Sequence, residues 1–349
     1  MNLWRRPAAW AAAALLLTGV GSGAWALGLL PGTTSCGGST LRITIAAQPE
    51  IAPALSDVAD RFNVEEHRVG GRCVDAHVTA ISPTGFMGDA ALRAKADAWV
   101  PESSLWLELA RDAGDTSVPP AGSPVATTPV VLATTHPVEA EFRDADLTIG
   151  WELLRKDEAG GFGLARAVPD PRTGMSGTIA MIAIDQVTEG QTDDADDADD
   201  VAEALRDNAP GRPDATSGAS TAVLADLTGA ERSARPLAVT TEQAVVAYND
   251  THRPNPIVGF MPDEGTLTLD HPYVVTTKNQ NRQDAADAFK AALGTGSARD
   301  TLQRAGFRAP DGTLTPAYAD EHDLPETAPP SLRVPTRKEI DKALKSWEA

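Results

Sequence analysis

The stretch Leu41-Arg42-Ile43-Thr44-Ile45-Ala46 decides the fold class, because its apolar residues alternate as they do in a half-buried strand. The polar loop Gln48-Pro49-Glu50 follows it directly. The next apolar residues fall at i, i+3, i+4 and i+7, the spacing of an amphipathic helix: Leu55, Val58, Ala59 and Phe62. A strand, a polar loop and a helix in this order form the repeating unit of an α/β domain.

The same unit recurs further along the chain. Residues 74–80 alternate as a second strand, a helix-like run covers Asp89–Ala96, and Ala98-Trp99-Val100 is a third strand. Further strands and helical stripes follow between residues 125 and 305. Strands separated by helices predict an α/β fold with parallel pairing and right-handed crossovers.

Composition excludes several classes of function. The chain has 349 residues and a formal net charge of −19, which argues against nucleic acid or an anionic lipid surface as the main partner. No serine-hydrolase elbow, zinc-protease motif, phosphate-binding glycine loop or dinucleotide fingerprint occurs. The six histidines are scattered without metal-ligand spacing. We therefore expect no catalysis, no cofactor and no bound metal.

The first 35 residues predict export. Arg5 and Arg6 precede an uncharged apolar run from about Pro7 to Leu30, which is typical of a signal peptide or a membrane anchor. The small residues of Ala24-Trp25-Ala26 offer a cleavage site, so both alternatives stay open. In each case the rest of the chain lies outside the cytoplasm, either secreted or attached to the membrane through its N-terminal segment.

The two cysteines, Cys36 and Cys73, have two interpretations. Cys36 follows a small residue just after the apolar run, as a lipidated cysteine does. In an oxidising compartment the two thiols form a disulfide, which is the interpretation we favour.

Two further segments differ in composition from the α/β core. Residues 190–220 begin with an acidic repeat and continue rich in Pro, Gly and Ser, which predicts a disordered acidic insertion. Residues 313–349 are a proline-rich tail ending in an amphipathic helix. The apolar stripe of that helix needs a partner surface on this chain or on another: Ile340, Ala343, Leu344 and Trp347.

Several short motifs, in a fixed order, resemble a known bacterial family. Two of them are Ile45-Ala46-Ala47-Gln48-Pro49-Glu50-Ile51-Ala52-Pro53 and Ala98-Trp99-Val100-Pro101-Glu102-Ser103-Ser104-Leu105-Trp106. Others are Val168-Pro169-Asp170-Pro171, Pro262-Asp263-Glu264-Gly265-Thr266, Asp270-His271-Pro272-Tyr273-Val274 and Ala305-Gly306-Phe307-Arg308. Together they resemble extracellular solute-binding proteins with the type II periplasmic binding fold, the receptors of ABC transporters. The likeness is greatest to members in which a von Willebrand factor type A domain follows.

The resemblance implies two lobes joined by two strand crossings. Lobe one would comprise residues 40–128 plus 270–312, and lobe two residues 129–269. The Asp-x-Ser-x-Ser metal motif of a von Willebrand A domain does not occur, so we expect the solute-binding half alone, as a stand-alone relative or as a fragment.

The resemblance also implies a ligand cleft lined by loops that precede helices. Helix N-termini present unpaired N–H groups, which suit carboxylates and oxyanions, so an anion is one candidate for the small solute. Loops from both lobes, the first crossing and a cleft rim or hinge give the candidate binding residues: Gln48, Pro49, Glu50, Ser103, Ser104, Thr127, Thr128, Arg172, Thr173, Ser176, Thr240, Thr241, Glu242 and Glu264.

Each candidate also has a purely structural interpretation. Ser104, Thr240 and Thr241 are good helix N-caps, and Pro49 is typical of a turn. Two other functions therefore stay open. One is an envelope interaction protein with the same fold and no solute, and the other, less favoured, is a hydrolase without a local signature. As a receptor the protein would work with a membrane permease or another envelope protein.

Overall fold

The computed structural model describes residues 39–188, 199, 202–203, 205–206, 219–230, 234–254 and 256–348. The predicted signal or anchor segment, Cys36 and most of the acidic insertion lie outside these residues. Within the described ranges no helix combines the length and the apolar character needed to cross a bilayer.

The first lobe is built on a six-stranded sheet in the order β2-β3-β1-β4-β13-β5. The strand predicted at residues 41–46 is its central strand β1, and its alternation places Ile43 and Ile45 in one core and Ala46 in the other. The strands of this sheet are β1 (Thr40–Ala47), β2 (Arg68–Val69), β3 (Arg72–Ala80), β4 (Ala98–Val100), β5 (Ser123–Pro124) and β13 (Pro272–Val275).

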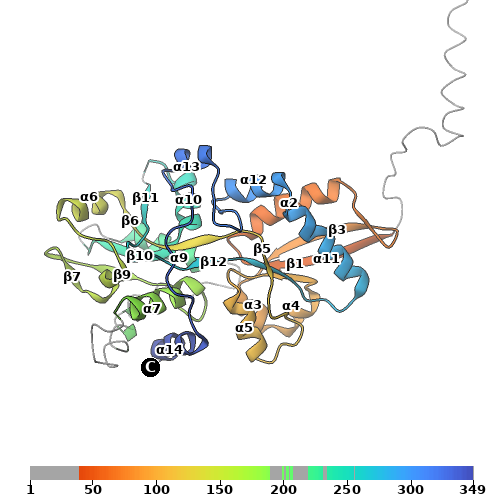
Figure 1. The fold of residues 1–349 in the computed structure, drawn as a ribbon, viewed down its shortest axis with the longest axis horizontal. Coiled ribbons are helices and arrows are strands. Elements are labelled where there is room, and N and C mark those ends of the chain that lie inside the picture. Colours follow the sequence, from red (N-terminus) through yellow and green to blue (C-terminus); the bar gives the residue numbers. More distant parts are fainter. Residues whose placement is uncertain are drawn as a thin grey trace, which may run out of the picture.

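Helices cover both faces of this sheet (Figure 1). One face carries α2 (Ala52–Val64), α11 (Gln280–Leu293) and α12 (Gly296–Arg304), and the other carries α3 (Pro83–Gly88), α4 (Ala90–Lys95) and α5 (Leu105–Asp112). On the first face the rings of Phe62 and Phe289 meet edge to face at 5.4 Å. On the second, Phe86 stacks on Trp99 at 4.2 Å. The sheet is therefore buried on both sides.

The second lobe has its own sheet, in the order β11-β6-β10-β9, with β12 paired to β6. Its strands are β6 (Thr128–Thr135), β9 (Ala165–Ala167), β10 (Pro236–Thr241), β11 (Ile257–Phe260) and β12 (Thr268–Leu269), with a separate hairpin of β7 (Glu158–Ala159) and β8 (Phe162–Gly163). Its helical elements are α6 (His136–Asp144), the 3-10 helix η1 (Trp151–Arg155), α7 (Met175–Thr188), α9 (Ala219–Gly229) and α10 (Glu242–Thr251).

The α/β fold in two lobes is as predicted, but the expectation of parallel pairing is only partly right. Strand β1 is parallel to β3 and β4, and β10 is parallel to β9. However, β13 is antiparallel to β4, and β6 is antiparallel to β10 and β11. The chain enters β6 and β13 from the other lobe, so the crossing sets their direction, and no helix intervenes to make them parallel.

Three chain segments meet where the lobes join. Residues 125–127 lead into β6 and residues 270–271 lead into β13. These two crossings are bonded to each other, since the Val125 N–H donates to the His271 carbonyl at 3.2 Å. The third segment is the end of the first lobe, where Arg308 and Thr127 exchange two backbone hydrogen bonds of 2.9 and 3.0 Å.

The C-terminal segment runs back over the second lobe. Helix α13 (Pro316–His322) packs against α10, and α14 (Arg337–Glu348) packs against α7 (Figure 1). The predicted apolar stripe of α14 is thus covered by this chain, with Ile340 and Trp347 in the large core cluster. A capping box is present at its start, since the Thr336 N–H donates to Glu339 Oε2 at 2.7 Å.

We expect Trp347→Ala to destabilise the protein, because the side chain is 2% exposed and its removal leaves a cavity between α14 and α7. Loss of a buried tryptophan costs about 3–5 kcal/mol. Thermal unfolding measures the effect, with Lys345→Ala on the exposed face of the same helix as the control. Equal midpoints for the two variants would show that α14 does not pack as described.

Candidate functional site

The first lobe contributes two neighbouring loops to the junction between the lobes. Because β1 and β4 lie side by side in the sheet, the loops at their carboxyl ends adjoin. Gln48 follows β1, and its N–H donates to the Val100 carbonyl at 2.8 Å. Glu102 follows β4 and is 2% exposed. Carboxyl ends of parallel strands are where α/β proteins place their ligands.

The second lobe presents the starts of α7, α9 and α10 to these loops. The first turn of α7 packs tightly against the loop around Pro169, and it can do so only because residue 177 is glycine. A Cβ at Gly177 would lie 1.9 Å from the Pro169 carbonyl oxygen. The close contact with the preceding loop brings the Met175 N–H to the lobe junction.

Glu102 joins the two lobes through its carboxylate. Its Oε1 accepts a hydrogen bond from Trp106 Nε1 of its own lobe at 2.9 Å and one from the Met175 N–H of the other lobe at 2.6 Å. Gln48 Nε2 lies 3.4 Å from its Oε2. The carboxylate therefore occupies the positive end of α7, where anions are stabilised.

Glu50 holds a similar place at the start of α9. Its Oε2 accepts a 2.6 Å hydrogen bond from Gln48 Nε2. Burial raises the pKa of Glu50 above its usual value, against the lowering effect of hydrogen bonds that include the backbone amides of Ser220 and Thr221. Lobe one thus directs two carboxylates at two helix starts of lobe two.

The surroundings of Glu50 and Glu102 raise the pKa of both carboxyl groups. Burial, reinforced by the nearby charge of Glu50, raises the pKa of Glu102 to about 7. Burial also lowers the pKa of His271 to about 3, so its imidazole is neutral at physiological pH. The cavity lining thus combines two carboxyl groups with raised pKa values, and it includes no lysine or arginine among the described residues.

The carboxylates border a cavity of about 10 Å³, close to the size of one water molecule. Ten residues from both lobes line it: Gln48, Glu50, Glu102, Thr128, Ser220, Thr241, Gln243, Leu269, His271 and Phe307. Three buried atoms of this group have no hydrogen-bond partner among the described residues: Gln48 Oε1, Glu50 Oε1 and His271 Nδ1. Buried polar atoms normally have partners, so these three are available to hydrogen-bond a bound molecule or a water.

Six of the candidates predicted from the sequence meet at or beside this cavity. Four of them line it: Gln48, Glu50, Thr128 and Thr241. Two more contact Ser220, which is also a lining residue. Thr240 Oγ1 donates to the Ser220 carbonyl at 2.7 Å, and the hydroxyls of Ser176 and Ser220 lie 3.1 Å apart.

Other candidates have their polar groups engaged in the fold. Thr241 Oγ1 caps α10 by accepting from the Ala244 N–H at 3.2 Å, while the Ser103 hydroxyl accepts from the Leu105 N–H at 3.3 Å. The Ser104 N–H donates to Asp270 Oδ1 at 2.7 Å. Thr127 donates to the Ala309 carbonyl at 2.9 Å.

Four more candidates do not line the cavity either. Arg172 is half exposed and pairs with Asp170 at 2.6 Å, and the Thr173 hydroxyl donates to the Asp170 carbonyl. Pro49 is a half-buried turn residue. Glu264 is exposed, and its carboxylate lies over Gly150, where a Cβ would come within 2.4 Å of Oε1.

Glu242 belongs to the hinge, where it forms a buried ion pair with Arg308. The guanidinium donates to Oε1 at 2.6 Å and to Oε2 at 2.8 Å, and the two side chains are 0% and 3% exposed. Arg308 also donates to the carbonyls of Gly312 and Thr327, both at 3.1 Å. Glu242 therefore fastens the second lobe to the chain segment that leaves the first.

Sequence reasoning did not select Glu102, Ser220, Gln243 or His271 as site residues. Glu102 had a usable signal, since an acidic residue directly after a buried strand occupies the same position as the Gln48 loop after β1. Ser220 and His271 had none, because only the meeting of the lobes brings a helix start and a crossing segment to the cavity.

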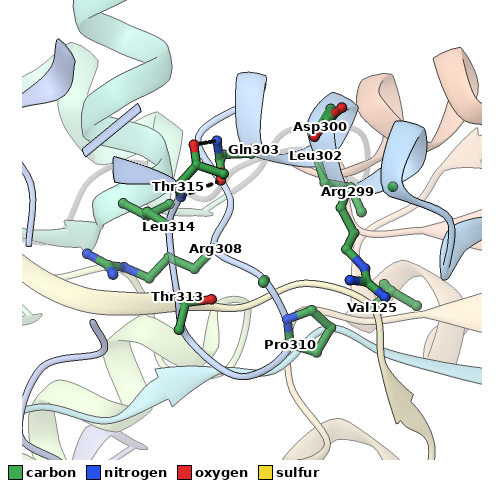
Figure 2. A pocket seen from close by; sticks show the side chains of 12 residues that line it. Val125, Arg299, Asp300, Leu302, Gln303, Arg308, Pro310, Thr313, Leu314 and Thr315 are labelled. Carbon is green, nitrogen blue, oxygen red and sulfur yellow. Dashed lines mark hydrogen bonds between the residues drawn. The ribbon is translucent and has the colours of Figure 1, made fainter. Parts of the chain in front are cut away.

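A second, larger cavity of about 280 Å³ lies between α12 and the loop that follows Arg308 (Figure 2). Gln303 and Thr315 bridge its rim by hydrogen bonds of 2.6 and 3.0 Å. None of the predicted binding residues lines it. The described residues contain no cluster of His, Cys, Asp and Glu arranged to hold a metal ion.

Comparison with known proteins gives one family. Residues 43–308 match the sequence profile of the bacterial extracellular solute-binding protein family. Uncharacterized protein Rv1836c of Mycobacterium tuberculosis H37Rv is 26% identical over 300 residues, which cover 79% of this chain. The match covers 43% of that protein, so the chain spans less than half the length of this curated relative.

Solved structures share the fold at low sequence identity. The sulfate-binding protein SubI from Mycobacterium tuberculosis H37Rv superposes with a TM-score of 0.55 at 18% identity, covering 89% of this chain and 97% of its own. A periplasmic thiamin binding protein gives a TM-score of 0.63 at 13% identity, covering 88% and 96%. At these identities the likeness concerns the fold.

We expect stability to fall as the pH rises through the range in which Glu102 titrates. Its pKa is raised from 4.5 to about 7 in the folded protein, so the folded state holds the proton more tightly. The stabilisation is therefore full below pH 4.5 and is lost by about pH 7, a difference of roughly 3 kcal/mol.

Thermal unfolding of the wild type and of Glu102→Gln between pH 4.5 and 8 measures this effect. Glu108→Gln, at an exposed position of α5, is the matched control. The wild type and the control should lose stability relative to Glu102→Gln as the pH rises. Parallel curves for all three proteins would contradict the raised pKa.

We expect Arg308→Ala to destabilise the protein by about 3–5 kcal/mol, because it leaves the Glu242 carboxylate buried without its partner. Arg172→Ala is the control, since it removes an ion pair with a half-exposed arginine, worth less than about 1 kcal/mol. Urea unfolding measures both. Similar midpoints for the two variants would mean that the hinge pair does not hold the lobes.

Proposed function

The chain belongs to the bacterial extracellular solute-binding protein family, and we propose that it captures a small solute between its two lobes. The observation that carries this proposal is the cavity at the lobe junction, lined from both lobes and bordered by three buried polar atoms that have no partner among the described residues. A solute that supplies those partners binds the closed form better than an open one, so it shifts the protein toward closure.

The proposed role involves no chemical reaction. Closure presents a changed surface to a membrane partner, such as the permease of an ABC-type transporter or another envelope protein. We propose the boundaries predicted above for the lobes, residues 40–128 plus 270–312 and residues 129–269. The cell location follows from the N-terminal segment, which would export the chain and either leave it secreted or keep it attached to the membrane.

An envelope interaction protein without a solute is the second candidate. The small size of the cavity favours it, because the closed lobes leave room for about one water molecule. The C-terminal apolar stripe does not support this candidate, because α7 of this chain already covers the stripe.

Solute capture predicts ligand-dependent stability. The full-length protein should gain about 2.7 kcal/mol in the presence of its solute at a hundredfold excess over the dissociation constant. A thermal-shift screen of cations, anions, sugars and amino acids measures this gain, and mass spectrometry of co-purifying small molecules identifies candidates. If no compound in a broad screen shifts the midpoint, the interaction-protein alternative is favoured.

We also propose the disulfide between Cys36 and Cys73. Cys73 is buried on β3, and the described residues include no free cysteine. The exported, unfolded protein should resist thiol alkylation until it is reduced, and Cys36→Ser should make Cys73 reactive after unfolding. Alkylation of both thiols without a reductant would exclude the bond.

A further inference from the structure

We propose that the solute is a small organic cation whose protonated amine lies between the carboxylates of Glu50 and Glu102. This inference rests on the proposed function and assigns the chemical class of its ligand. It replaces the anion that the loop-and-helix pattern suggested in the sequence.

The charge of the site favours a cation. Glu50 and Glu102 are the charged side chains among the ten lining residues, and no lysine or arginine is in that set. Two arginines in the neighbouring segments are already engaged, Arg172 with Asp170 and Arg308 with Glu242. Two carboxylates buried together need a positive partner to be ionised at the same time.

The unpaired atoms are hydrogen-bond acceptors. Gln48 and His271 are 1% and 2% exposed, and Gln48 Oε1 and His271 Nδ1 have no donor within the described residues. The pKa of His271 is lowered, so its imidazole is neutral, and a neutral imidazole has one ring nitrogen that accepts a hydrogen bond. Glu50 Oε1 is a third acceptor. A primary ammonium group has three donors and no acceptor, which matches this set.

The helix starts that would hold an oxyanion already hold carboxylates. The Met175 N–H donates to Glu102 at 2.6 Å, and the amides of Ser220 and Thr221 act on Glu50. An anion would have to displace these carboxylates and lie beside their charge. The N-terminal ends of α7 and α9 are thus already occupied by carboxylates of the protein itself.

The size of the cavity sets how such a solute enters. A volume of about 10 Å³ accommodates the ammonium group alone, so the lobes must open to admit the rest of the molecule. Because the cation favours the ionised carboxylates, its affinity should rise with pH as Glu102 loses its proton. The other groups that line the cavity around this carboxylate are Glu50, Gln48 and His271.

Isothermal titration calorimetry of the full-length protein tests the inference. The cationic probes are the primary ammonium ions methylammonium and putrescine, the anionic probes are sulfate and phosphate, and glucose is the neutral probe. We expect at least one cation and no anion to bind, with an affinity about thirtyfold higher at pH 8 than at pH 5.5, as a pKa of about 7 for Glu102 requires. Glu50→Gln and Glu102→Gln should each weaken binding at least tenfold, and Glu108→Gln should leave it unchanged.

The outcomes separate this inference from the function on which it rests. Binding of an anion or of glucose, with no cation bound, would overturn the cation assignment and leave solute capture standing. Binding of a cation that both site variants retain unchanged would place it elsewhere and overturn the assignment as well. If none of these probes binds and the broad thermal-shift screen is also negative, both proposals fail. If a variant does not fold, the pH dependence of the wild-type affinity for the cation still tests the assignment.

Discussion

The burial of the Glu102 carboxylate is the constraint on which the lobe junction depends. A buried charge must be hydrogen-bonded, because burying an unpaired charge costs much more free energy than a single contact contributes. Its partners come from three places: Trp106 in the following helix α5, Gln48 in the adjacent loop and the Met175 N–H across the junction. One buried carboxylate of the first lobe is therefore bonded directly to the start of α7 in the second lobe.

The hinge uses a second buried charge in a different way. Arg308 and Glu242 are both almost fully buried and form a bidentate pair, so neither can separate without leaving a charge unpaired. The pair holds α10 to the segment that has just left the first lobe, while Thr127 bonds the same segment through its backbone. The same segment continues to α13 and α14 on the second lobe, so the chain passes between the lobes three times. Any opening motion must bend all three.

These features together favour a binding module with a preorganised interior. The loops at the ends of β1 and β4 carry the carboxylates, and the helix starts of the second lobe orient them. The solved structures that share the fold place no limit on the ligand, since their sequence identities are 18% and 13%. In the proposed site, the selectivity of this chain would depend on its own Gln48, Glu50, Glu102 and His271.

Alternation and helical spacing in the sequence determined the order of strands and helices, the loops that lead into helices and the α/β class, because these are local signals. The two lobes were implied by the resemblance to extracellular solute-binding proteins. It also indicated six residues that meet at the cavity. Only the tertiary structure decided that α14 packs on α7, that β6 and β13 run antiparallel to their neighbours, and that Arg172 and Glu264 lie away from the cavity lining. It alone brought Glu102, Ser220 and His271 together, because these contacts join residues far apart in the chain and depend on how the two lobes close.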